Sequence, residues 1–229
     1  MLRDRPSLEN MSEFLQYLAA HDQVDAQALP KLADLSSHLG ISVASLREQL
    51  EVARALGLVE VKPRTGIRRL TYTFLPAVRQ SLGYAMALDQ AHFREFADLR
   101  QHVEAAFWHE AVDALTDEDR ERLRTIMSRA WDKLHGTPVQ IPHEEHKQLH
   151  LTIFGRLNNP FVTGILEGYW EAYEAIGLNV FNDYSYLQEV WQYHQQMVDS
   201  ICSRDYEAGY RALLAHADLL YQRPDSLKR

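Results

Sequence analysis

Four histidines in the C-terminal two thirds of the chain carry its clearest metal-binding chemistry. His146 and His150 are four residues apart in a segment with helical periodicity, so both imidazoles lie on one face of a helix. His194 and His216 fall on two further predicted helices, and antiparallel packing of those helices would bring them close. The i,i+4 pair favours a chelating site, and the alternative is a set of ordinary surface or core histidines.

A second group of residues fits the chemistry of nucleic-acid binding. Residues 62–69 contain four Lys or Arg and no acidic residue, although the whole chain has a formal net charge of −8. They form the turn and flanks of a predicted β-hairpin, and Arg47 lies on the helix before it. A helix-turn-helix with such a wing needs positive charge only where the phosphates lie. The alternative is a protein-docking winged helix with a solvated basic turn.

The charge distribution divides the chain into two units. Residues 1–76 hold nine basic and nine acidic residues, whereas the remainder holds 15 basic and 23 acidic ones. We therefore expect a DNA-binding domain over 1–74 and a second, acidic domain over 75–229. The lone Cys202, a charged N-terminus and the lack of any run of roughly 20 apolar residues indicate a cytoplasmic protein that does not cross a membrane.

The hydropathy pattern predicts a mainly α-helical fold with one small β-hairpin. In the first unit we expect a winged helix-turn-helix, with helices over 7–20, 32–39 and 42–56 and strands over 58–61 and 67–72. In the second unit we expect an all-α bundle of six or seven helices, over 75–89, 92–115, 116–134, 143–157, 161–176, 185–202 and 205–221.

The first unit resembles the winged-helix domain of GntR-family bacterial repressors. The segments that carry this resemblance are Leu39-Gly40-Ile41-Ser42, Leu46-Arg47-Glu48-Gln49-Leu50 and Gly57-Leu58-Val59-Glu60-Val61 with the hairpin up to Gly66. The resemblance implies that a dimer binds double-stranded operator DNA through Ser42, Ser45, Arg47, Lys62, Arg64, Thr65, Gly66 and Arg68. Val43 stands where the family usually has a DNA-contacting Arg, so the operator should differ from the common family sequence or be read more by the wing.

The second unit resembles the FCD-type effector domain of the FadR subgroup. The resemblance rests on residues 96–100 with Val103-Glu104, on His150 before Asn159, and on the separation of His194 and His216. It implies a homodimer and a divalent metal held by His150, His194 and His216, with His146 in the place of the family's aspartate. Imidazole ligands favour zinc, with nickel second. His143, one further turn back on the same stripe, is a possible substitute ligand.

The resemblance also places Arg100 at the effector pocket, where its planar fork matches a carboxylate. We expect a repressor that is not an enzyme, that binds a palindromic operator and that responds to a small carboxylate bound at the metal. One alternative is a metal-free pocket for an acyl-type ligand. Another is a histidine-ligated metalloenzyme with Glu145 or Asp199 as its base.

Overall fold

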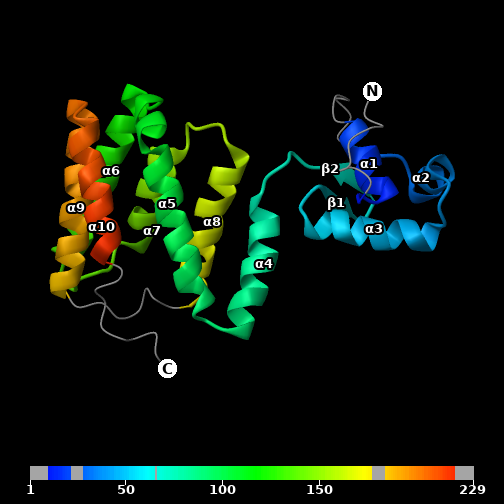
Figure 1. Cartoon of the computed structure of the whole chain (residues 1–229), viewed down its shortest axis with the longest axis horizontal. Coiled ribbons are helices and arrows are strands. Elements are labelled where there is room, and N and C mark those ends of the chain that lie inside the picture. Colours follow the sequence, from blue (N-terminus) through cyan, green and yellow to red (C-terminus); the bar gives the residue numbers. More distant parts are fainter. Residues whose placement is uncertain (1–9, 22–27, 65, 177–183, 220–229) are drawn as a thin grey trace. The chain divides into compact units, whose positions relative to one another are not determined.

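A computed structural model describes residues 10–21, 28–64, 66–176 and 184–219 of the chain (Figure 1). The chain divides into two compact units, 1–80 and 81–229. Helix α4 (Leu75–Leu88) contains the point of division. The boundary predicted at residue 74 lies just before the start of this helix. Each unit is described below by itself.

Before the start of α4, the described residues of the first unit form three helices and a two-stranded antiparallel sheet. Its elements are α1 (Glu13–Ala20), α2 (Leu32–Leu39), α3 (Val43–Ala55), β1 (Val59–Lys62) and β2 (Gly66–Arg69). In the hairpin Val59 pairs with Arg69 and Lys62 pairs with Gly66. This order is the winged helix-turn-helix that the hydropathy pattern predicts.

Local capping residues set the helix boundaries in this unit. Gly40 ends α2 in the left-handed conformation, with φ of 68°, and the Ser42 side chain caps α3 by accepting from Ser45 N at 3.1 Å. Helix α1 begins at Glu13 and not near residue 7, because Ser12 is its N-cap. The start predicted at residues 7–9 lies outside the described residues, and residues 10–12 are not helical.

A small apolar core holds the three helices together, and the Gln49 side chain links α1 to α3. Phe14, Leu35 and Leu46 are almost fully buried and belong to one cluster with Val59 of β1. The Gln49 side chain on α3 accepts from Phe14 N at 2.9 Å, so it caps the first turn of α1. Gln49 therefore has a structural role, because its side chain connects α3 to the start of α1.

The second unit is a helical bundle. Its further helices are α5 (His92–Asp113), α6 (Asp117–Leu134), α7 (His143–Phe154), α8 (Pro160–Ala175), α9 (Tyr184–Ser203) and α10 (Tyr206–Leu219). These bounds lie within a few residues of the predicted ones, and no strand occurs among the described residues after Arg69. The predicted fold class, a small winged unit followed by an all-α bundle, is confirmed.

Helix starts in the bundle follow the capping signals of the sequence. Thr116 and Asp119 form a reciprocal capping box at the start of α6. At the start of α8 the Asn159 side chain accepts from Phe161 N at 3.1 Å, and Pro160 occupies the first helical position. Side chains close to the first residue of each helix therefore determine where α6 and α8 begin.

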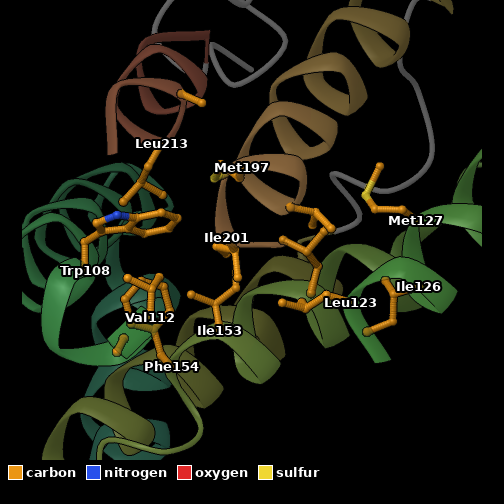
Figure 2. Packing of buried hydrophobic residues seen from close by; sticks show 14 of the residues in the cluster. Trp108, Val112, Leu123, Ile126, Met127, Ile153, Phe154, Met197, Ile201 and Leu213 are labelled. Atoms are coloured by element: carbon orange, nitrogen blue, oxygen red, sulfur yellow. The ribbon is translucent and has the colours of Figure 1, made fainter. Parts of the chain in front are cut away.

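Residues from all six helices α5 to α10 form the core of the bundle (Figure 2). Trp108, Phe154, Ile201 and Leu213, from four different helices, point toward one another there. Trp108 is fully buried and its indole N–H donates to Tyr206 O at 2.9 Å. Within the described ranges, none of the helices is long and apolar enough to span a bilayer.

Candidate functional site

Three helices of the bundle bring the four predicted histidines into one cluster. His146 and His150 come from α7, His194 from α9 and His216 from α10. Each histidine offers one nitrogen, and the four nitrogens all lie within 4.8 Å of one another. The tertiary structure therefore assembles the set of histidines that the sequence singled out.

Three of the four histidines are buried and His146 is half-buried, and burial favours the neutral form of their imidazoles. His150 and His194 have no exposed surface, and His216 is 7% exposed. Burial lowers the pKa of His146, His194 and His216 well below the ordinary value of 6.5, and neighbouring positive groups add to this effect. A neutral imidazole has a free lone pair, which is the form that binds a metal ion.

The distances and the unsatisfied atoms fit a divalent ion. Nε2 of His150 lies 3.2 Å from Nε2 of His194. Two nitrogens that bind one zinc ion at about 2.0–2.1 Å must lie about 3.0–3.4 Å apart, so this pair is already at ligand spacing. Nε2 of His146 and Nδ1 of His194 are buried and make no hydrogen bond within the described part of the chain. The nitrogens that His146 and His216 offer lie within 4.8 Å of this pair.

A buried ion pair on α5 lies against the cluster. Arg100 and Glu104 are one helical turn apart, and Nη2 of Arg100 lies 2.9 Å from Oε2 of Glu104. Oε1 of Glu104 lies 3.0 Å from Nδ1 of His150. Burial by itself raises the pKa of the Glu104 carboxyl, but Arg100 and His150 outweigh burial and hold that pKa below its ordinary value. Glu104 is therefore an anion beside a metal ligand.

Arg100 is enclosed by aromatic rings. Its guanidinium carbon lies 4.6 Å from the centre of the Tyr169 ring and 5.6 Å from that of Trp170. Its Nε is buried and makes no hydrogen bond to any described residue. Arg100 also lines a surface groove between α5 and α10, together with Glu104 and His216.

A small cavity opens on the other side of the cluster. It is lined by His143, His146, Tyr173, Trp191 and His216, among others, and has a volume of about 30 Å³. A space of this size holds a water molecule or a group of similar size. His143 borders this cavity but does not belong to the group of four whose nitrogens converge.

Neither candidate base of the metalloenzyme alternative joins the cluster. Oε2 of Glu145 accepts from Nζ of Lys133 at 2.7 Å, which ties the start of α7 to α6. Asp199 accepts from the Gln195 side chain at 2.8 Å on the exposed side of α9. Both carboxylates therefore have partners away from the histidines.

The expected DNA-facing residues occupy α3 and the hairpin. Arg47 is exposed on α3, whereas Ser42 caps this helix and Ser45 is half-buried. Lys62 and Arg64 are exposed, and Arg64 and Gly66 have positive φ at the tip. Thr65 lies outside the described residues.

An acidic residue in the wing was not singled out from the sequence. Glu60 on β1 lies 2.8 Å from Nζ of Lys62 and 3.9 Å from Nη1 of Arg68. Glu60 and Lys62 share one face of β1, and the register of the hairpin places Arg68 opposite Glu60, so the expected strand pairing could have pointed to Glu60. Arg47 and Arg64 make no ion pair that involves Glu60.

Comparisons with known proteins match both units. The FCD domain family matches residues 95–219. An uncharacterized HTH-type transcriptional regulator of Bacillus subtilis, YcbG, is 26% identical over 86% of this chain and 82% of its own. A second such regulator, YieP of Escherichia coli, is 24% identical over 82% of this chain and 81% of its own. The structure of a Streptococcus agalactiae GntR protein covers 91% of this chain and 95% of its own at a TM-score of 0.67 and 16% identity, a likeness of fold.

Proposed function

The chain belongs to the FCD domain family, and from this premise we propose that it is a ligand-responsive, DNA-binding transcriptional regulator of the GntR family, FadR subgroup. One observation carries the proposal: four histidine nitrogens within 4.8 Å lie inside the matched domain of a chain that also has a winged helix. The regulators YcbG and YieP, which match most of the chain, support it.

The winged unit would bind the operator. Helix α3 is the second helix of the helix-turn-helix, the one that enters the major groove in this class of motif. Arg47 would contact the DNA from α3, and Lys62, Arg64 and Arg68 would contact the backbone or the minor groove from the wing. A palindromic operator needs two such units at a fixed spacing, and so the proposal includes a homodimer.

The histidine cluster would hold a divalent ion, zinc by preference and nickel second. His146, His150, His194 and His216 are its ligands in this proposal. Bound there, the ion would supply a positive charge that four neutral imidazoles do not cancel, so an anionic ligand would bind favourably beside it. The buried Nε of Arg100, which has no hydrogen-bond partner among the described residues, offers a further donor to such an anion.

The proposed effector is a small carboxylate. A cavity of about 30 Å³ lies beside the histidines, and the groove that Arg100, Glu104 and His216 line has a volume of about 320 Å³, so there is space for a compact anionic molecule next to the cluster. The effector must bind more tightly to one arrangement of the two DNA-binding units than to the other, because equal affinity would shift no equilibrium. As a repressor, the protein would release its operator when the effector favours the arrangement that does not fit DNA.

The experiment is a fluorescence anisotropy titration of the full chain with DNA from upstream of its own gene, in the presence of competitor DNA. We expect specific binding in the wild type and at least about a tenfold loss in Arg47→Ala and in Arg64→Ala, as is typical of lost base or phosphate contacts. Arg129→Ala is the matched control, because Arg129 is exposed on α6 of the other unit. Equal loss of affinity in all three variants, or no specific binding by the wild type, would contradict the proposal.

A further inference from the structure

His150 has two possible partners for the nitrogen that faces away from the cluster. Nδ1 of His150 lies 3.0 Å from Oε1 of Glu104 and 2.8 Å from Nη2 of Arg100. A carboxylate only accepts hydrogen bonds, and a guanidinium only donates them. The two neighbours therefore favour opposite protonation states of the same nitrogen.

These preferences decide whether His150 can bind a metal ion. If Nδ1 carries the proton and donates to Glu104, Nε2 has a free lone pair that points at the other histidines. If Arg100 donates to Nδ1, the proton of the neutral ring is on Nε2, where His194 Nε2 lies 3.2 Å away and can accept it. In this second tautomer Nε2 is no ligand.

We propose that Glu104 is the positioning residue of the metal centre: it holds His150 as the Nδ1–H tautomer, and Arg100 opposes it. This inference rests on the metal site of the proposed function and adds a division of roles between two buried residues. The ring stays neutral with one proton, which is on Nδ1 in one tautomer and on Nε2 in the other. Glu104 also places a negative charge next to a site whose four ligands are neutral.

Arg100, Glu104 and His150 are all buried, so their hydrogen bonds to one another determine the tautomer of His150. Arg100 is 3% exposed, Glu104 1% and His150 0%, so bulk water cannot replace either partner. Both oxygens of Glu104 are engaged, one by Arg100 and one by His150. Removing one member must therefore change the hydrogen bonding of the other two.

Zinc binding should weaken when Glu104 is changed but not when Arg100 is changed. We expect Glu104→Gln to weaken zinc binding by about 10- to 100-fold, the usual effect of losing a carboxylate that supports a metal-bound histidine. Arg100→Met should bind zinc as tightly as the wild type or more tightly, because the opposing donor is gone. Glu110→Gln is the control for charge, since Glu110 is exposed on the same helix.

The measurement is the zinc affinity of the metal-free full chain in competition with a chromophoric chelator, with folding of each variant checked by circular dichroism. Equal weakening by Glu104→Gln and Arg100→Met would overturn the inference, because it would show that the ion pair only supports the fold. Unchanged affinity in a folded Glu104→Gln protein would overturn it as well. Zinc affinity that falls in Glu104→Gln but not in Arg100→Met would support it.

A second measurement needs no variant. Long-range ¹H–¹⁵N NMR spectra of the zinc-loaded wild type report which imidazole nitrogen of His150 carries the proton. We expect a protonated Nδ1 and a metal-bound Nε2, and zinc on Nδ1 would overturn the inference while leaving the metal site of the proposed function intact. A wild type that binds no zinc would overturn both.

Discussion

Nε2 of His150 on α7 and Nε2 of His194 on α9 face each other at 3.2 Å, although 44 residues separate them in the chain. Two nitrogen lone pairs at this distance repel each other unless a proton or a cation lies between them. Both rings are fully buried, so water cannot relieve the repulsion. A neutral N–H on one ring that donates to the other satisfies this contact, and a cation bound to both nitrogens satisfies it in the tautomer that leaves both Nε2 atoms unprotonated.

Loss of either histidine should abolish metal binding. We expect about one zinc per chain in untagged wild type and little in His150→Ala or His194→Ala, measured by elemental analysis of protein that was dialysed against trace zinc. His102→Ala, a change of the same kind at an exposed position on α5, should keep its zinc. Zinc at a hundred times its dissociation constant should also stabilise the wild type by about 2.7 kcal/mol. Full occupancy in all three variants would show that the metal binds elsewhere.

The metal-free protein should lose stability as the pH falls below 6.5. The folded-state pKa values of His146, His194 and His216 lie well below the ordinary 6.5, mainly because of burial. Below pH 6.5 the unfolded chain binds protons that the folded chain does not, so stability is present above this pH and is lost as the pH falls toward the folded pKa values. Each such histidine contributes a slope of up to about 1.4 kcal/mol per pH unit.

Urea unfolding of the metal-free protein at pH 7.5, 6.5 and 5.5 measures this loss. In His194→Gln the slope between pH 6.5 and 5.5 should be smaller, since one of the histidines is gone. Carboxyl groups act at lower pH: the pKa of Asp119 is lowered from 3.8 to about 2, chiefly by the hydrogen bond from Arg156, and its contribution is lost only between those values. Equal stability at pH 7.5 and 5.5 would contradict the burial of neutral imidazoles.

Asp119 should matter more than its acidic neighbours at the start of α6. Its carboxylate accepts from Thr116 N at 2.9 Å and from Nε of Arg156 at 2.9 Å, so it caps α6 and ties it to the end of α7. Asp119→Ala should lower the free energy of unfolding by about 1–2 kcal/mol, the usual range for a lost cap. Glu118→Ala, at an exposed position in the same turn, should change it by less than about 0.5 kcal/mol. Urea unfolding of both variants at pH 7 tests this difference.

Two helical glycines should respond to alanine with opposite signs. A Cβ at Gly209 on α10 would lie 2.6 Å from Cζ2 of Trp108, which is fully buried and fixed by its own hydrogen bond. Gly209→Ala should therefore destabilise the protein by about 1–3 kcal/mol. A Cβ at Gly83 on α4 meets no described atom within 4 Å, so Gly83→Ala should stabilise the helix by up to about 1 kcal/mol. Thermal unfolding of both variants compares them directly.

The amino-acid sequence by itself determined the helices, the hairpin and the identity of the four histidines. Capping signals such as Ser42 and Thr116 act within a few residues, and the i,i+4 spacing of His146 and His150 places both on one helix face. Local physics of this kind can be predicted without tertiary structure. The prediction that α1 already includes residues 10–12 was wrong, because Ser12 is the N-cap and the helix begins at Glu13.

Only the tertiary structure decided the distances within the site and the role of Glu104. The contact between His150 and His194 depends on how α7 and α9 pack, and no spacing in the chain encodes a distance of 3.2 Å. From the sequence alone, Glu104 is an ordinary i,i+4 partner of Arg100. In the folded protein its second oxygen also lies against Nδ1 of His150. On a helix surface water would compete for the hydrogen bonds of this ion pair. Burial removes that water, and so Glu104 can determine which nitrogen of His150 carries the proton.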